Sequence, residues 1–200
     1  MDGTHGFGIE TDPIGDLHCH FFVCDTHKWM YGPRGTGLIW GRSEEWCEML
    51  RVVPSFTDVM DAYSADEPFE GRMNGRHFTP GGFHSLEHRW AAAAAFDFHE
   101  RIGRERIRDR IRQLNRQLKE GLAAMKHVTL HTPMSHDLSA GITAFEIQGM
   151  KSKDAMKKLR ERRIIATVAP YSTGYLRLTP GIINTPEEVD AGLEAIRRLA

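Results

Sequence analysis

The sequence predicts an α/β fold, because short apolar and β-branched segments alternate with segments of helical periodicity. Its 200 residues are 40% hydrophobic and 26% charged, which is typical of a globular domain. The net charge is −1 at pH 7, so no overall field attracts the chain to nucleic acid or to an anionic membrane. The longest apolar run, Trp90–Phe96, is far shorter than the ~20 residues that span a bilayer. The sequence therefore predicts no nucleic-acid and no membrane partner.

Two strands are predicted near the N-terminus. The run 17–24 has the apolar character and length of a short buried strand, and Gly37–Trp40 follows as a second one after a polar stretch. Residues 43–82 keep neither a helical nor a strand period. We therefore expect mostly loop with short elements there.

One long amphipathic helix is predicted from Ser85 onward, bent near Gly103. Apolar side chains recur at helical spacing, at Ile107, Ile111, Leu114, Leu118 and Leu122. The arginines of this segment alternate with acidic residues, which favours a solvated helix face over a nucleic-acid stripe.

The C-terminal part is predicted to have the order β, β, α, β, β, α. The four strand segments are 128–130, 142–145, 164–168 and 175–178. Ser152 and Thr185 stand where N-caps belong, for helices that reach about residues 162 and 199, and Pro186 suits the first helical position. The predicted domains are residues 1–122, which include the long helix, and residues 123–200.

A cluster of histidines and cysteines, His18, Cys19, His20 and Cys24, offers zinc-ligand chemistry. Their spacing argues against a site, because His18 and Cys19 would point to opposite faces of a strand and no second ligand pair follows. The preferred interpretation is packed or surface side chains, with no metal. Three cysteines, an odd number, suggest free thiols, and with no export signal in the sequence they predict a cytoplasmic location.

Lys28 is the candidate for covalent chemistry. It follows the first predicted strand and precedes the turn 32–37. A partly desolvated lysine at the carboxyl end of a strand can form a Schiff base with an aldehyde. A lone lysine is usually a solvated surface residue. Lys28 is a stronger candidate because Asp2, within Asp-Gly-Thr-His at residues 2–5, stands 26 positions before it in the sequence.

Three motifs in order resemble the class V aminotransferase family of pyridoxal-phosphate (PLP) enzymes. They are residues 2–5, residues 26–29 with the turn 32–37, and Arg177 with residues 184–190. The pattern of residues 26–37 is most similar to the isopenicillin N epimerase-like branch. The resemblance implies the C-terminal part of a fold-type I transferase, with a partial large domain and a small α+β domain.

The resemblance also implies the cofactor site. Lys28 would be the lysine that bonds to PLP, and Asp2 would pair with the pyridine nitrogen so that the ring accepts carbanion density. His5 would reach the phenolic oxygen of the ring. His27 would contact the phosphate, with help from the hydroxyl of Thr26.

Further positions are implied for the phosphate and the substrate. Thr79 resembles a threonine that reaches the cofactor phosphate of the neighbouring subunit in family dimers, although an ordinary turn is an equal alternative. Arg177 would bind the substrate carboxylate through two parallel donors, the alternative being a surface salt bridge. Asp25 departs from the family pattern, in which a serine is common at this position. Its negative charge would repel a phosphate, so Asp25 is not expected to be a phosphate ligand.

The predicted activity is chemistry at the α-carbon or α-amino group of an amino acid, epimerase-like or transaminase-like. We expect the chain to be a fragment that lacks the N-terminal half of such an enzyme, a homodimer when complete, with little activity alone. A cysteine desulfurase or sulfur lyase is an alternative, but a desulfurase needs a cysteine shortly before Arg177 and no cysteine follows Cys47. A non-catalytic metal-binding or interaction module is the third possibility.

Overall fold

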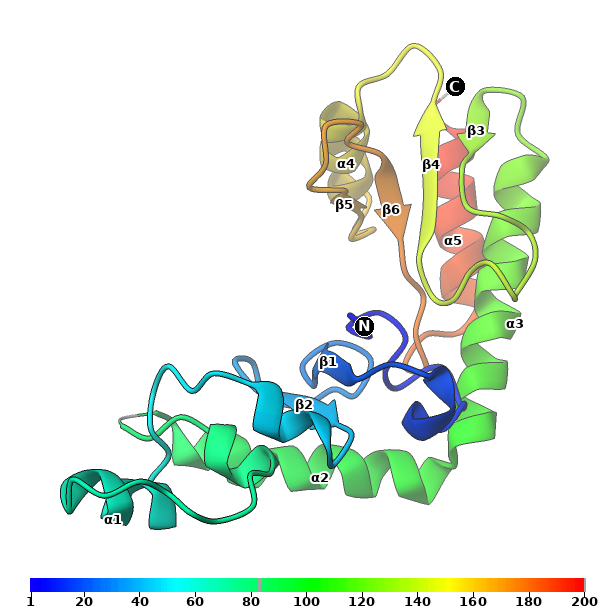
Figure 1. Cartoon of the computed structure of the whole chain (residues 1–200). Helices are drawn as coiled ribbons and strands as arrows, with labels where there is room; N and C mark the ends of the chain where they lie inside the picture. Colours follow the sequence, from blue (N-terminus) through cyan, green and yellow to red (C-terminus); the bar gives the residue numbers. More distant parts are fainter. Residues whose placement is uncertain (83, 200) are drawn as a thin grey trace. The chain divides into compact units, whose positions relative to one another are not determined.

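The computed structural model describes residues 1–82 and 84–199 and divides into two compact units (Figure 1). The N-terminal unit comprises residues 1–7 and 12–101, and the C-terminal unit comprises residues 8–11 and the chain from residue 102 onward. Each unit combines strands with helices, so the predicted α/β class is confirmed. Among the residues described, no helix has the length and apolar character needed to cross a membrane.

The N-terminal unit is built on an antiparallel pair of strands, β1 (Phe21–Asp25) and β2 (Gly37–Gly41). Both strands were predicted, but β1 begins later than the apolar run suggests. A 3-10 helix, η1 (Ile14–Leu17), and a left-handed backbone at His18 (φ 51°) occupy the start of that run. A residue in the left-handed region cannot continue an extended strand.

The first residues of the chain lie parallel to β1. The Val23 N–H donates to the Met1 carbonyl at 3.0 Å, and the Gly3 N–H donates to the Val23 carbonyl at 2.8 Å. Asp2 is thereby bridged to Val23 in parallel register. Parallel neighbours end at the same edge of a sheet. The segments that follow Asp2 and β1 therefore leave from the same edge.

Residues 43–82 are mostly loop with short elements, as predicted. These elements are η2 (Glu45–Glu48), α1 (Asp58–Ser64) and η3 (Gly75–Phe78). Trp46 on η2 is buried between aromatic rings, 5.2 Å from the ring of Phe21 and 5.3 Å from that of Phe78. Aromatic contacts thus tie this loop region to β1.

The prediction of one long helix is wrong, because the segment forms two helices. α2 (Leu86–Ile102) ends before Gly103, and α3 (Arg104–Ala123) begins after it. Gly103 has φ 96° and ψ 132°, a conformation that breaks the helical hydrogen bonds and that a side chain disfavours. The apolar face predicted for α3 is buried throughout, at Ile107, Ile111, Leu114, Leu118 and Leu122.

The C-terminal unit has a four-stranded antiparallel sheet in the order β3-β4-β6-β5. The strands are β3 (Val128–Leu130), β4 (Thr143–Ile147), β5 (Thr167–Val168) and β6 (Leu176–Leu178). Helix α4 (Ser152–Glu161) lies between β4 and β5 in the chain, and α5 (Pro186–Arg197) follows β6. The predicted order β, β, α, β, β, α is confirmed.

The two predicted N-caps have opposite outcomes. Thr185 caps α5 in a capping box, in which its hydroxyl accepts from the Glu188 N–H and the Glu188 side chain accepts from the Thr185 N–H. Ser152 is the first residue of α4 instead, and Lys151 stands at the N-cap without a side-chain cap. The Ser152 prediction was wrong because the turn into this helix begins one residue earlier than the serine suggests.

One face of this sheet packs against all three helices of the unit. Figure 1 shows α4 and α5 behind the strands, and the buried cluster takes Phe145 and Leu176 from the sheet together with residues of α3, α4 and α5. The units divide at Ile102, whereas the sequence places the domain division at residue 122. α3 groups with the C-terminal unit because Leu114, Leu118 and Leu122 of its apolar face lie in this core. That residue 122 divides functional domains stays a prediction.

Candidate active site

Lys28 lies in the connection between β1 and β2, three residues beyond the end of β1. Its side chain is about one-third exposed, and its Nζ donates a hydrogen bond to Oδ2 of Asp25 at 2.9 Å. The ammonium of Lys28 holds the pKa of the Asp25 carboxyl below its usual range. The candidate nucleophile therefore stands in an ion pair with an ionised carboxylate.

Two buried hydroxyls hold the turn that carries Lys28. The hydroxyl of Thr36 donates to the Pro33 carbonyl at 2.6 Å, so the bond between the Thr26 and Thr36 hydroxyls has Thr26 as its donor. The backbone closes the same turn, because the Gly32 N–H donates to the Thr26 carbonyl at 2.7 Å. A Cβ at Gly32 would lie 2.8 Å from that carbonyl oxygen, so the turn requires glycine there.

Helix α2 supports the residue that follows Lys28. Nε2 of His99 bonds to the Trp29 carbonyl at 2.9 Å, and both side chains are buried. Burial lowers the pKa of His99, so the ring is neutral near pH 7 and donates its Nε2–H to the carbonyl. The turn that contains Thr36 was selected from the sequence, but the role of its hydroxyl and the support from His99 were missed, because each acts on a residue distant in the chain.

Asp2 presents an ionised carboxylate near Lys28. Its Oδ1 accepts the Thr4 N–H at 2.9 Å, and this hydrogen bond lowers the pKa of Asp2, with smaller contributions from His5 and Lys28. The side chain is exposed and a carboxylate has a second oxygen. It can therefore accept a hydrogen bond from a protonated ring nitrogen.

The remaining predicted cofactor residues of the N-terminal unit are exposed. His5 follows Asp2 at the shared sheet edge, and His27 places its Nδ1 4.0 Å from Oδ2 of Asp25. The structure thus brings four predicted residues to one edge, namely Asp2, His5, His27 and Lys28. Thr79 is the C-cap that follows η3, and its N–H donates to the Arg76 carbonyl at 3.3 Å, so it stands on a separate segment.

Arg177 lies on β6 in the C-terminal unit, opposite Ala144 of β4 and Thr167 of β5. Its side chain is half-buried, and its Nε is buried without a hydrogen-bond partner among the residues described. A buried N–H left unpaired is costly. This donor is thus available to a ligand with an acceptor oxygen, as a substrate carboxylate would be.

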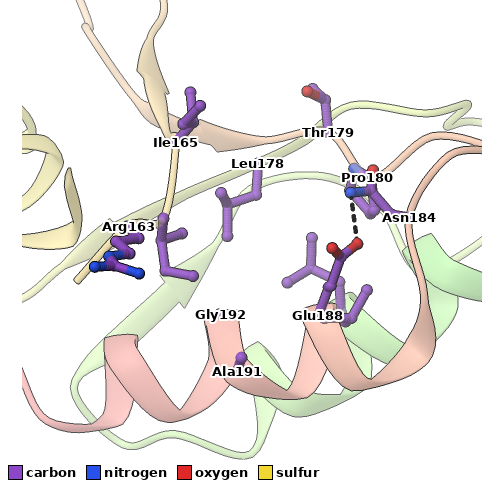
Figure 2. Close-up of a pocket in the computed structure, with 12 residues that line it drawn as sticks. Arg163, Ile165, Leu178, Thr179, Pro180, Asn184, Glu188, Ala191 and Gly192 are labelled. Carbon is purple, nitrogen blue, oxygen red and sulfur yellow. Dashed lines mark hydrogen bonds between the residues drawn. The ribbon is translucent and has the colours of Figure 1, made fainter.

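A cavity of about 370 Å³ lies elsewhere in the C-terminal unit. Figure 2 shows Ala191 and Gly192 of α5 across from Leu178, with Glu188 hydrogen-bonded to Asn184 at 3.0 Å. None of the described residues that line it is a predicted site residue. The cavity therefore holds none of the side chains predicted to bind cofactor or substrate.

The cysteines and histidines of the N-terminal unit do not gather. Cys24 is buried on β1, and burial raises the pKa of its thiol to about 11. Cys19 is half-buried and Cys47 is exposed on η2, and both thiols are free. Within the part of the chain that the structure describes, no three His, Cys, Asp or Glu side chains are grouped as metal ligands would be.

Comparison with known proteins identifies the class of protein. The sequence model of the family Aminotransferase class-V matches residues 1–191. The chain belongs to the class V aminotransferase family, as its motifs predicted.

The curated relatives include two kinds of enzyme. Isopenicillin N epimerase of Streptomyces clavuligerus is 31% identical over the whole chain, which covers 52% of that protein. A cysteine desulfurase of Pectobacterium carotovorum is 27% identical, again over the whole chain and 51% of the relative. The chain thus spans about half the length of the curated relatives it matches.

Solved structures share the fold at low sequence identity. The apo structure of a cysteine desulfurase from Thermococcus onnurineus NA1 superposes with a TM-score of 0.83 at 22% identity, covering 99% of this chain and 51% of that one. A C-DES variant with glycine covalently linked to the PLP cofactor gives a TM-score of 0.81 at 20% identity, covering 96% and 49%. The predicted fold, a partial fold-type I α/β domain with a small α+β domain, agrees with these neighbours.

Proposed function

We propose that this chain is part of a PLP-dependent enzyme that acts at the α-carbon or α-amino group of an amino acid, epimerase-like or transaminase-like. The observation that carries the proposal is the Lys28 amine, which lies just beyond the end of β1, at the same sheet edge as the ionised carboxylate of Asp2. Family membership supports the cofactor, and the 31% identity to isopenicillin N epimerase supports the epimerase-like reading.

The residues present fit the ring end of PLP better than its phosphate end. Asp2 offers an ionised carboxylate for the ring nitrogen, and Lys28 offers the amine. Next to the predicted phosphate contacts, Asp25 is ionised, and the Thr26 hydroxyl already donates a hydrogen bond to the Thr36 hydroxyl. Thr26 would have to break that bond before donating to a phosphate. His27 and Thr79 are exposed and are the remaining candidates.

The chemistry divides between cofactor and protein. When bound, PLP supplies an electron-accepting ring that stabilises negative charge at the substrate α-carbon. Asp2 would hold the pyridine nitrogen in its protonated form, and His5 would be the residue available to the phenolic oxygen. Lys28 would hold the cofactor through its amine, and the same amine would be the base and acid that moves a proton at the substrate α-carbon. Arg177 orients the substrate through its carboxylate.

A cysteine desulfurase is the second candidate, because several relatives and structural neighbours are such enzymes. The thiols of this chain stand at Cys19, Cys24 and Cys47, and the sequence places none between Cys47 and Arg177. The cysteine that a desulfurase needs shortly before Arg177 is therefore missing from this sequence, which favours the first candidate. A cytoplasmic location and a homodimeric state stay predictions.

The test is to trap the lysine that bonds to PLP. The protein is incubated with PLP, reduced with borohydride and digested, and the modified peptide is identified by mass spectrometry. We expect the adduct on Lys28, and we expect Lys28→Ala to lose it while the exposed Lys126→Ala keeps it. An adduct confined to another lysine, with Lys28 unmodified, contradicts the assignment.

A further inference from the structure

We propose that Asp25 is a positioning residue that holds the Lys28 ammonium in the cofactor-free chain and restrains its reaction with aldehydes, most strongly with aldehydes that carry a phosphate. The inference rests on the proposed function, because it takes Lys28 as the reacting amine. It assigns to Asp25 a role that its position at the end of β1 and its bond to Lys28 support.

The geometry is that of a partly shielded ion pair. Lys28 Nζ lies 2.9 Å from Asp25 Oδ2, and the two side chains are 34% and 39% exposed. The residues are three apart, and β1 and the buried hydroxyls of Thr26 and Thr36 fix the backbone between and around them. The carboxylate is therefore presented to Lys28 by a rigid segment rather than by a mobile loop tip.

The ion pair opposes reaction in two ways. An ammonium has no lone pair, so Lys28 must lose a proton and its hydrogen bond to Asp25 before its nitrogen can attack a carbonyl carbon. The carboxylate stays ionised near pH 7 because Lys28 lowers the pKa of Asp25. Its negative charge then also opposes the approach of a phosphate, which carries up to two negative charges, but not that of a neutral aldehyde.

Other charges face the same pair. His27 Nδ1 lies 4.0 Å from Asp25 Oδ2, and Asp2 interacts electrostatically with both Lys28 and Asp25. Asp2 adds negative charge near Lys28 on a neighbouring segment, and His27 offsets it when protonated. Removal of Asp25 alone leaves both groups in place, so its effect can be separated from theirs.

The experiment compares Lys28 reactivity toward three reagents in the cofactor-free chain. The reagents are an acetylating ester, pyridoxal with borohydride, and PLP with borohydride, each at limiting concentration. Peptide mass spectrometry gives the Lys28 rate relative to the exposed Lys126. The variants are Asp25→Asn, which keeps the shape and removes the charge, Asp25→Glu, which keeps the charge, and Asp16→Asn, which removes an exposed charge on η1.

We expect Asp25→Asn to raise acetylation of Lys28 about twofold to fivefold, the range for a partly exposed ion pair. The ratio of PLP to pyridoxal labelling should rise at least about twofold further, because a phosphate feels the lost charge more than a neutral aldehyde. Asp25→Glu should keep that ratio close to the unmodified value, and Asp16→Asn should change neither quantity. A merely structural role of Asp25 would not shift the ratio between the two aldehydes.

Unchanged Lys28 acetylation in Asp25→Asn overturns the inference, as does an unchanged ratio of PLP to pyridoxal labelling. If Asp25→Asn does not fold, the unmodified chain decides, since added salt weakens the pair and should raise Lys28 acetylation relative to Lys126. No rise would overturn the inference. Failure of the proposed function looks different, because PLP would then label another lysine while acetylation of Lys28 still responds to Asp25.

Discussion

Different kinds of interaction stabilise the interiors of the two compact units. In the C-terminal unit, one apolar cluster joins the sheet to α3, α4 and α5. The N-terminal unit contains buried polar side chains that form hydrogen bonds within it. They include the hydroxyls of Thr26 and Thr36 and the rings of His77 and His99. In the unit that carries Lys28, individual hydrogen bonds therefore fix the backbone on both sides of the lysine.

The largest expected effect lies in the apolar cluster of the C-terminal unit. Leu118→Ala removes a side chain that is 2% exposed, and the cavity should lower the free energy of unfolding by about 2–5 kcal/mol. Hydrogen exchange of α3 and β4 measures the change within this unit. The control is Leu138→Ala in the same unit, where the side chain is 73% exposed. Equal effects of the two substitutions would contradict the assignment of the core.

The hydroxyl pair of the N-terminal unit should have the next largest effect. Thr36→Val keeps the shape of the side chain but leaves the buried Thr26 hydroxyl without its acceptor, at a cost of about 1–3 kcal/mol. All four tryptophans lie between residues 29 and 90, so their fluorescence reports on this unit. Thr36→Ser retains the hydroxyl and should recover most of the stability. A stable valine variant would show that the turn does not need the pair.

This contrast explains which parts of the fold could be predicted from the sequence. The buried face of α3 and the order of strands and helices along the C-terminal part of the chain follow from periodicity, because their apolar residues recur at the spacing of the element that buries them. The break at Gly103 could be placed but not its extent, since a glycine permits a bend or a full break. The start of β1 was misplaced because His18 adopts a left-handed backbone after η1, a conformation that the apolar pattern does not predict.

The candidate site divides in the same way. Lys28 and Asp2 could be selected from sequence motifs, and the parallel bridge to β1 brings their segments to one edge. The ion pair with Asp25 and the support from Thr36 and His99 could not be predicted, because they depend on how a turn and a distant helix fold around the lysine. Sequence spacing carries no information on such contacts.

A smaller effect is expected at the start of α5, in the C-terminal unit. Thr185→Ala removes the hydroxyl that accepts the Glu188 N–H at 3.2 Å, and loss of such a cap costs about 0.5–2 kcal/mol. Hydrogen exchange in the first turn of α5 measures it. Thr185→Ser keeps the cap and serves as the control. Loss of stability in both variants alike would mean that the hydroxyl is not what stabilises the helix start.

The smallest expected effect is on the pH dependence of the N-terminal unit. Burial lowers the pKa of His99 in the folded chain below its ordinary value of 6.5, so the unfolded chain binds the proton more readily. The stability that neutral His99 contributes is complete above about pH 6.5 and is lost as the pH falls toward the folded-state value. Protonation also leaves a charge in a buried site beside the Trp29 carbonyl.

His99→Gln should flatten this dependence, because the glutamine amide can donate to the Trp29 carbonyl and does not titrate. Urea unfolding followed by tryptophan fluorescence between pH 5 and pH 8 compares the slopes of stability against pH. The control is His88→Gln, which removes an exposed histidine from the same helix and should leave the slope unchanged. If the His99 and His88 variants keep the slope of the unmodified chain, protonation at His99 does not limit this unit, and its support of Trp29 is purely geometric.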